Sequence, residues 1–424
     1  MMAPQSSLTP ASGKLGLLVC GGPAPGINSV LGAATIRARL AGVEVIGIHD
    51  GFKHIMEGDI SRVTSLEIHS TSRIHFHGGS YIGISRGGPC DDPKHMQNTL
   101  KSLERLGVNM LITIGGDGTA YVANQLSLAG KGAVRVVHVP KTIDNDIDLP
   151  LDMPTFGFQT ARHVGVELVE NLMVDARTTS RWYFVVTQGR KAGHLALAIG
   201  KAAGATLSLI PEEFPRGAPM RLLVDTLVGA MIKRLAGGGK GHGVAMLAEG
   251  LAGVVRPEDL ARYTMVPHDA SGAISFASIH MGDVLQRAVT ERLAELGMKV
   301  SAHAKEIGYE LRCAAPIPYD MEYTRDLGYS AARHILGGGD RVVVSMQNGR
   351  FVPIPFEDLI DAETGKTRIR MVDLESDRYK IARTYMVRLG RSDFASDAEV
   401  AKLSAVCGLT PEAFRSAFEH VVLG

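Results

Sequence analysis

The chain has 424 residues, enough for two or three domains, and its 45% hydrophobic residues provide ample material for a core. Its 45 basic and 44 acidic residues leave a net charge of +1, so bulk charge gives no sign of a nucleic-acid or membrane-surface binder. Four widely spaced cysteines and the lack of a run of about 20 apolar residues predict a cytoplasmic protein without a membrane span.

Residues 1–14 are polar and are expected to be disordered. Residues 15–20 (LGLLVC) predict a short buried strand, because they are apolar throughout and end in Gly-Gly. Residues 27–40 have apolar positions at helical spacing, and residues 43–48 (VEVIGI) predict a second strand. This βαβ unit implies parallel pairing and a right-handed crossover.

The same pattern recurs along the chain. Further apolar strands are predicted at 110–114, 134–139, 183–187 and 243–247, and each ends in a Gly-rich or charged cluster. In doubly wound α/β sheets, ligands bind beyond the carboxyl ends of the strands. The fold class expected is therefore α/β, with the clusters forming one composite site.

The first cluster, GGPAPG at 21–26, joins a strand to a helix. Glycines let a phosphate approach the backbone, and the free N–H groups at a helix start favour an anion. A tight turn without any ligand is the alternative.

The second cluster, GGDGT at 115–119, places Asp117 between glycines at the end of a strand. An Asp in this position can hold Mg²⁺ while the glycines leave room for phosphates. An ordinary Asp-Gly turn is the alternative.

The third cluster, PKTIDND at 140–146, places Asp144 and Asp146 two residues apart after a buried strand. If the segment is extended, both carboxylates project to the same face, where one can accept a proton from an attacking hydroxyl. The alternative is an Asx-turn in which Asn145 and the Asp residues satisfy local N–H groups.

Three further residues lie beside glycines or strand ends. Arg86 in GISRGG and Arg190 in QGR carry guanidinium groups that match phosphate geometry. Glu249 follows the strand at 243–247 and can accept hydrogen bonds from sugar hydroxyls.

Taken together, these segments resemble the phosphofructokinase family. The ordered set is GGPAPGIN, GISRGG, GGDGT, PKTIDND, TFGFQTA, QGR, AEG and GYELR, running from Gly21 to Arg312. The resemblance implies two doubly wound α/β domains with the active site in the cleft between them. It divides the chain into a donor-binding domain (15–155 and about 313–366) and a sugar-phosphate-binding domain (156–312 and about 367–424).

The resemblance also implies the role of each site residue. Asp144 would be the base that takes the proton from the 1-hydroxyl of the sugar, with Thr142, Asp146 and Arg190 as the other catalytic residues, and Asp117 would hold Mg²⁺. The residues implied to bind the phosphoryl donor are Gly22, Arg86, Gly116, Asp117, Gly118, Thr119 and Lys141. Those implied to bind fructose 6-phosphate are Thr142, Asp144, Arg181, Gln188, Gly189, Arg190, Glu249, Tyr309 and Arg312. Because Arg181 would reach the sugar phosphate of a neighbouring subunit, a homodimer or homotetramer is expected.

Two positions bear on the donor. Pyrophosphate enzymes of the family typically carry a second Asp where this chain has Gly118, and the open space left by Gly118 favours ATP. Lys141 favours pyrophosphate, because pyrophosphate enzymes carry Lys at that position. ATP is the favoured donor, since an absent carboxylate removes both a steric and an electrostatic barrier.

The function expected is therefore transfer of a phosphoryl group from ATP to fructose 6-phosphate in glycolysis, giving fructose 1,6-bisphosphate. A pyrophosphate-dependent fructose-6-phosphate 1-phosphotransferase is the first alternative. A kinase of a related sugar phosphate such as sedoheptulose 7-phosphate is the second. The intact Asp117, Asp144, Asp146 and Arg190 argue against a silent regulatory subunit.

Overall fold

The computed structural model describes residues 13–239, 241–267, 276–359 and 367–422. The chain forms two compact units: unit 1 comprises Met1–Ala161 and Tyr309–Arg370, and unit 2 comprises Arg162–Gly308 and Met371–Gly424. The expected disordered segment 1–14 extends too far, because strand β1 already begins at Lys14. Residues 1–12 lie outside the described part.

The sheet of unit 1 has the strand order β12-β11-β5-β4-β1-β2-β3. From β11 to β2 neighbouring strands are parallel, and the edge strands β3 and β12 are antiparallel to their neighbours. The short strand β6 pairs with β5. The strands are β1 Lys14–Val19, β2 Glu44–Ile48, β3 Val63–Ser65, β4 Val108–Gly115, β5 Arg135–Thr142, β6 Phe156–Gly157, β11 Val342–Gln347 and β12 Arg350–Pro355.

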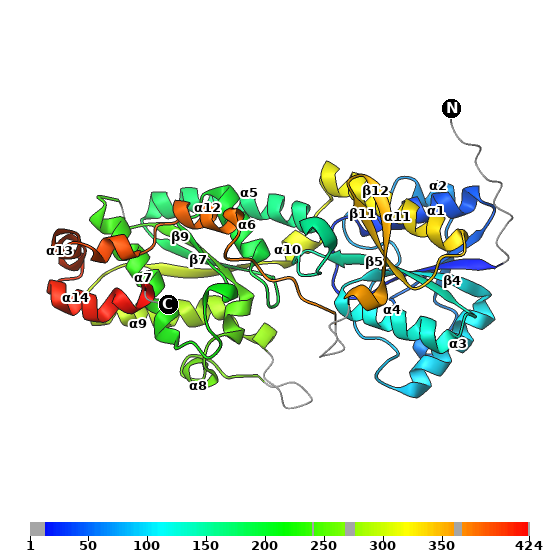
Figure 1. Cartoon of the computed structure of the whole chain (residues 1–424), viewed down its shortest axis with the longest axis horizontal. Coiled ribbons are helices and arrows are strands. Elements are labelled where there is room, and N and C mark those ends of the chain that lie inside the picture. Colours follow the sequence, from blue (N-terminus) through cyan, green and yellow to red (C-terminus); the bar gives the residue numbers. More distant parts are fainter. Residues whose placement is uncertain (1–12, 240, 268–275, 360–366, 423–424) are drawn as a thin grey trace. The chain divides into compact units, whose positions relative to one another are not determined.

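Helices cover both faces of this sheet, with α1 and α11 on one face and α3 and α4 on the other (Figure 1). Helix α1 packs directly on α11. Their close approach depends on Gly328, where an added Cβ would lie 2.5 Å from the carbonyl oxygen of Val30. The helices are α1 Ile27–Leu40, α2 Ile68–Thr71, α3 Pro93–Leu106, α4 Asp117–Gly130, α10 Tyr309–Arg312 and α11 Pro318–Leu336.

The sheet of unit 2 has the order β10-β7-β9-β8 and is parallel throughout. Its strands are β7 Trp182–Thr187, β8 Leu207–Leu209, β9 Gly243–Ala248 and β10 Ala302–Ile307. Its helices are α5 Phe158–Thr179, which begins in unit 1, α6 His194–Ala203, α7 Met220–Ala236, α8 Pro257–Leu260, α9 Met281–Glu295, α12 Asp377–Tyr385, α13 Asp397–Val406 and α14 Pro411–Phe418.

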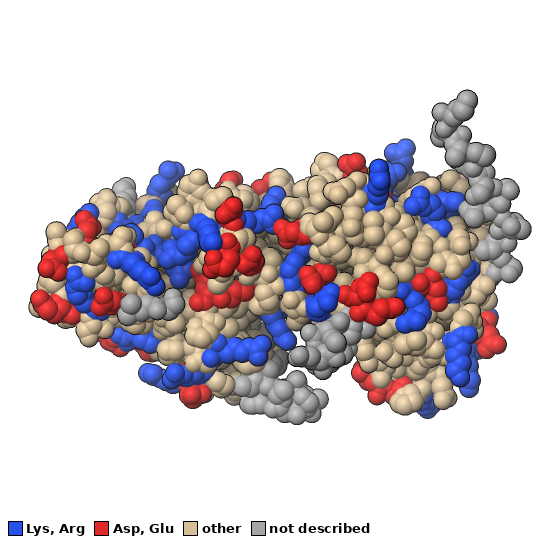
Figure 2. All heavy atoms as spheres, viewed as in Figure 1, with Lys and Arg blue, Asp and Glu red and all other residues tan. Residues whose placement is uncertain are grey.

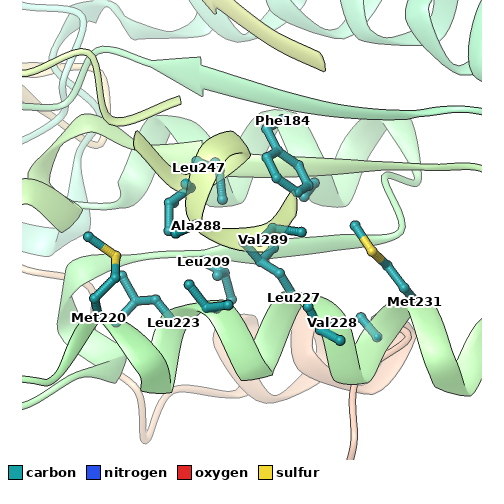
Figure 3. Close-up of a cluster of buried hydrophobic side chains, with 14 of the residues drawn as sticks. Phe184, Leu209, Met220, Leu223, Leu227, Val228, Met231, Leu247, Ala288 and Val289 are labelled. Atoms are coloured by element: carbon teal, nitrogen blue, oxygen red, sulfur yellow. The ribbon is translucent and has the colours of Figure 1, made fainter. Parts of the chain in front are cut away.

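The core of unit 2 lies between its sheet and helices α7 and α9 (Figure 3). Leu223 and Leu227 of α7 are fully buried with Phe184 of β7 and Leu247 of β9. Burying a large apolar side chain contributes about 1.5–3 kcal/mol. This packing fixes the strands whose carboxyl ends carry QGR and AEG.

Short 3₁₀ helices occupy several connections. They are η1 Ile55–Glu57, η2 Pro150–Asp152, η3 Pro211–Glu213, η4 Glu249–Gly253, η5 Phe276–Ser278, η6 Phe356–Leu359, η7 Arg391–Phe394 and η8 Glu419–Val422.

The unit boundaries fall a few residues from those expected. Residues 156–161 belong to unit 1 because β6 pairs with Lys141 and Thr142 of β5. Tyr309 and Arg312 belong to unit 1 rather than to unit 2, since the chain leaves unit 2 directly after β10. Residues 367–370 also belong to unit 1, where Ile369 forms a bridge with Ile147.

Basic and acidic side chains are interspersed on the face seen in Figure 2, as the near-zero net charge suggests. In the described part of the chain, no helix has the length and apolar character needed to cross a membrane.

Candidate active site

Three of the predicted clusters meet at one edge of the sheet of unit 1. Strands β1, β4 and β5 are neighbours, and their register places Gly115 opposite Pro140. Lys141, at the end of β5, is buried and donates a hydrogen bond from Nζ to the carbonyl oxygen of Gly22. The loops at 21–26, 115–119 and 141–146 therefore lie together, with a buried ammonium group among them.

The loop at 21–26 depends on glycine at both ends. Gly21 has φ +88° and Gly26 has φ +110°, values that L side chains rarely adopt. The N–H of Gly21 donates to the carbonyl oxygen of Ser85 at 2.9 Å, which brings the GISRGG segment beside this loop. Arg86, the next residue, is exposed.

The segment GGDGT begins helix α4. Gly116 is the N-cap and Asp117 the first helical residue, so the simple Asp-Gly turn considered as the alternative does not form. An added Cβ on Gly118 would meet no atom within 4 Å, whereas the side chain of Thr119 is buried. The first backbone N–H groups of this 14-residue helix are suited to an anion.

His138 of β5 is hydrogen-bonded to the first residue of the GGDGT segment, Gly115. Its Nδ1 lies 2.8 Å from Oγ1 of Thr113, and its Nε2 lies 3.1 Å from the carbonyl oxygen of Gly115. The carbonyl oxygen can only accept, so Nε2 carries the proton and Nδ1 accepts from the Thr113 hydroxyl. Complete burial lowers the pKa of His138 to about 3, and the ring is neutral.

The segment TIDND bends at Asn145, so the condition of an extended segment is not met. Asn145 has φ +59°, in the left-handed region, so Asp144 and Asp146 are not related by strand alternation. The N–H of Asp144 donates a hydrogen bond to Oγ1 of Thr142, at 3.0 Å. Asp144 and Asp146 are both buried, with 8% and 6% of their surfaces exposed.

Two residues outside the predicted set hold this bend and the start of α5. Thr155 donates from its N–H to Oδ1 of Asn145 and from its hydroxyl to the carbonyl oxygen of Thr142. Asp320 accepts from the N–H groups of Gly157 and Thr160 and from the Thr160 hydroxyl. Burial raises the pKa of Asp320. Thr155 lies in the quoted block TFGFQTA, whereas Asp320 lies outside the quoted blocks and is 163 residues from Gly157, so spacing does not reveal it.

Tyr309 and Arg312 also lie in unit 1. The Arg312 guanidinium stacks on the Tyr309 ring at 4.5 Å from its centroid. A Cβ on Gly22 would lie 3.4 Å from Nη1 of Arg312, so this cation borders the glycine loop. Tyr309 is 72% exposed.

In unit 2, QGR and AEG are joined by direct hydrogen bonds. Oε1 of Glu249 accepts from the N–H of Gly189 at 3.2 Å and of Arg190 at 2.7 Å. Arg190 has φ +51° and is exposed. Gln188 packs against Gly308, where an added Cβ would lie 2.9 Å from Cδ of Gln188.

Arg181 is partly exposed between α5 and β7 of unit 2, and no other predicted site residue is hydrogen-bonded to it in the described part of the chain. Its backbone N–H donates to the carbonyl oxygen of Ala176, and its carbonyl oxygen accepts from Gly243. Its position is thus fixed at the start of the sheet, at the opposite end of β7 from Gln188.

The predicted residues therefore form two groups, each described by itself. Unit 1 contains Gly22, Arg86, Gly116, Asp117, Gly118, Thr119, Lys141, Thr142, Asp144, Asp146, Tyr309 and Arg312; unit 2 contains Arg181, Gln188, Gly189, Arg190 and Glu249.

Comparison with known proteins identifies the class. The phosphofructokinase family model matches residues 14–335, and the chain belongs to the phosphofructokinase family. The sequence prediction of the family is confirmed.

Particular relatives cover almost the whole chain. The chain is 47% identical over 415 residues to the pyrophosphate–fructose 6-phosphate 1-phosphotransferase of Thermotoga maritima, covering 96% of this chain and 98% of the relative. It is 42% identical over 430 residues to the enzyme of the same name from Naegleria fowleri, covering 99% and 98%. An ATP-dependent 6-phosphofructokinase of Natranaerobius thermophilus is 30% identical over 349 residues, covering 82% and 93%.

The fold comparison agrees with the expected class. The crystal structure of a pyrophosphate-dependent phosphofructokinase from Nitrosospira multiformis matches with a TM-score of 0.67 at 15% identity, covering 88% of this chain and 91% of that one. At this identity the match establishes the fold, and the prediction of two α/β domains is confirmed.

Proposed function

We propose that this protein transfers a phosphoryl group from pyrophosphate to the 1-hydroxyl of fructose 6-phosphate, giving fructose 1,6-bisphosphate. The geometric observation that carries phosphoryl transfer is the meeting of three loops, GGPAPG, GGDGT and TIDND, at one sheet edge around buried Lys141. The donor rests on the relatives at 47% and 42% identity, both named for pyrophosphate.

In this proposal Asp144 is the general base. Its burial limits the approach to its carboxylate, and the Thr142 hydroxyl fixes its backbone N–H. Phosphoryl transfer to a hydroxyl requires a general base, and a carboxylate held in position can accept the proton of the attacking hydroxyl. Asp146, across the left-handed Asn145, supports the base or the metal.

Mg²⁺ is the proposed cofactor, and Asp117 is its proposed protein ligand. Among the described residues no three His, Cys, Asp or Glu side chains gather into a metal site. Mg²⁺ bound to phosphate esters commonly takes one or two carboxylates, with phosphate oxygens and water as the other ligands, and Asp117 at the start of α4 fits that mode. When bound, the ion neutralises charge on the phosphate oxygens.

The donor phosphates are proposed to lie against the glycine loops. Gly22, Gly116, Gly118 and Thr119 leave backbone N–H groups near the start of α4, with Arg86 and Lys141 supplying positive charge. The buried Lys141 ammonium is well suited to a compact, highly charged anion, because burial strengthens its attraction for the anion.

Fructose 6-phosphate is proposed to bind Thr142, Asp144, Gln188, Gly189, Arg190, Glu249, Tyr309 and Arg312. Arg190 is the proposed stabiliser of charge on the transferring phosphoryl group, and its main-chain N–H is held by Glu249. Arg181 is proposed to contact the sugar phosphate of a neighbouring subunit in a homodimer or homotetramer.

ATP is the second candidate donor, and one observation favours it. No atom lies within 4 Å of a Cβ placed on Gly118, so this position leaves open space for the rest of a nucleotide. Pyrophosphate takes precedence because the ATP-dependent relative matches at only 30% identity over a smaller share of the chain.

The test is a steady-state assay of the purified protein with Mg²⁺, fructose 6-phosphate and either pyrophosphate or ATP. We expect a higher kcat/KM with pyrophosphate, and a higher value with ATP would reverse the choice of donor. Sedoheptulose 7-phosphate as a competing acceptor should be used less efficiently. Asp144→Ser is expected to lower kcat severely with little change in donor binding, whereas near-normal turnover would remove Asp144 from the role of base.

A further inference from the structure

The last described segment of unit 1, residues 367–370, lies against the TIDND loop. Ile369 forms an antiparallel bridge with Ile147, and the N–H of Arg370 donates to the carbonyl oxygen of Asp146 at 2.8 Å. More than 200 residues separate Arg370 from this loop along the chain, so the contact is a product of the fold.

The guanidinium of Arg370 donates hydrogen bonds to the same loop and to Met153. Nε donates to the carbonyl oxygen of Asn145 at 3.0 Å, Nη2 donates to Oδ1 of Asn145, and Nη1 donates to the carbonyl oxygen of Met153 at 2.9 Å. The side chain is only 9% exposed, and the nearest oxygen of Asp152 is 3.6 Å from Nη1. A planar fork of donors can satisfy these three acceptors together, which a lysine ammonium on a flexible stem cannot do in the same geometry.

Asn145 is the residue that sets the directions of its two neighbours. Its left-handed φ of +59° is unfavourable for most L residues; asparagine tolerates it better than most, and contacts with the surrounding structure hold it there. Arg370 binds both the backbone carbonyl and the side chain of Asn145, and Thr155 donates to the same side-chain oxygen. The bend between Asp144 and Asp146 is thus stabilised mainly by hydrogen bonds from the Arg370 guanidinium.

We propose that Arg370 is a positioning residue of the reaction: it holds Asn145 in the left-handed conformation and so orients the Asp144 carboxylate toward the acceptor hydroxyl. This inference rests on the proposed function, in which Asp144 is the base. Arg370 acts through Asn145 and has no part in binding the donor or the sugar phosphate.

The test compares Arg370→Lys with Arg368→Lys. Arg368 is two residues away on the same segment, but it is about half exposed, with Asp148 and the Asp358 carbonyl oxygen as its partners. For Arg370→Lys we expect kcat to fall roughly 10- to 100-fold, the scale of an ångström-sized misplacement, with both KM values within about threefold of wild type. Arg368→Lys should keep wild-type kcat.

A second pair of measurements separates positioning from a loss of folding. In Arg370→Ala, added methylguanidinium should restore part of the lost kcat, because it can occupy the vacated site, and it should not affect wild type. Asn145→Ala should lose kcat to a similar degree, and the Asn145→Ala/Arg370→Lys double variant should lose little more than either single variant.

The outcomes are distinct. If wild type transfers no phosphoryl group to fructose 6-phosphate, the proposed function fails. If wild type is active and Arg370→Lys keeps kcat within about twofold, or raises KM instead, the positioning role is overturned and the function stands. If Arg370→Lys does not fold, Asn145→Ala decides: a normal kcat there also overturns the proposal, and a matching loss with unchanged KM supports it.

Discussion

The Glu249 carboxylate holds the backbone of Arg190 through a 2.7 Å hydrogen bond from the Arg190 N–H. The same oxygen accepts from Gly189, so one side chain at the end of β9 fixes the loop that follows β7. The positive φ of Arg190 shows why such a tie is needed, since a non-glycine residue in this region depends on its surroundings.

We expect Glu249→Ala to raise the KM for fructose 6-phosphate by about 10- to 100-fold, because it removes an acceptor of two N–H groups that is worth about 1.5–3 kcal/mol when charged. Glu249→Gln, which keeps one acceptor oxygen, should lose less. Initial-rate kinetics at saturating donor measure the effect, and Glu258→Ala, at an exposed position of helix α8, is the control. An unchanged KM in Glu249→Ala would remove Glu249 from the proposed sugar-phosphate site.

Gly118→Asp should impair the use of ATP while leaving the fold intact. The new side chain has open space in the structure, but its charge would repel a nucleotide phosphate. We expect kcat/KM with ATP to fall about tenfold or more, while kcat/KM with pyrophosphate changes by less than about threefold. Equal losses with both donors would contradict the role given to this position.

Lys141→Met should weaken donor binding more than acceptor binding. The Lys141 ammonium is buried beside Gly22, so its removal takes away positive charge in a poorly solvated place. We expect the KM for pyrophosphate to rise about tenfold or more, with the KM for fructose 6-phosphate nearly unchanged. Lys131→Met, at the far end of helix α4, is the control. A larger rise in the KM for fructose 6-phosphate would place Lys141 on the acceptor side.

His138 predicts a dependence of stability on pH. Its pKa falls from 6.5 in an unfolded chain to about 3 in the folded protein, so between these values the unfolded state binds the extra proton. The contribution of His138 to the free energy of unfolding is constant above pH 6.5. Below that pH the contribution falls by about 1.4 kcal/mol per pH unit, or by about 2 kcal/mol between pH 6.5 and 5.

Urea denaturation of wild type and His138→Gln at several pH values measures this contribution. Glutamine retains one donor and one acceptor for Gly115 and Thr113 but does not titrate. As the pH falls from 6.5 to 5, the free energy of unfolding of wild type should fall relative to that of His138→Gln. His163→Gln, at a half-exposed position, is the control. A difference that does not vary with pH would mean that His138 is not buried in the neutral form.

Asp320→Ala should destabilise unit 1. Asp320 is fully buried and accepts three hydrogen bonds from the start of α5, so its removal leaves buried donors without a partner. We expect a loss of about 2–4 kcal/mol in the free energy of unfolding. Asp326→Ala, an exposed position on the same helix, should cost little. A loss below about 0.5 kcal/mol for Asp320→Ala would contradict the capping role.

Much of the fold was predictable because the central parallel strands are largely apolar and each is followed by a Gly-rich or charged cluster. Helix α1 begins at Ile27 and ends at Leu40 as its apolar spacing predicted, and β9 begins at Gly243 as expected. The loops that follow β1, β4 and β5 could be located for the same reason.

The shape of the site was less predictable. The left-handed conformation of Asn145 depends on Arg370 and Thr155, and the capping of α5 depends on Asp320, which lies 163 residues from Gly157. Such contacts follow from tertiary packing, and no local spacing in a single sequence encodes them. The neutral state of His138 likewise results from burial rather than from its neighbours in the sequence.

The chain crosses between the two units three times, and these crossings determine the order in which the units can be completed during synthesis. Helix α1 packs on α11, and β5 pairs with β11, yet α11 and β11 follow the whole sheet of unit 2 in the sequence. A nascent chain therefore exposes the apolar faces of α1 and β5 until residues 318–347 have left the ribosome. Unit 2 has its four strands available earlier, but its buried core also includes Leu403 of α13 and Phe414 of α14, so it is completed only after residues 397–418 have been synthesised.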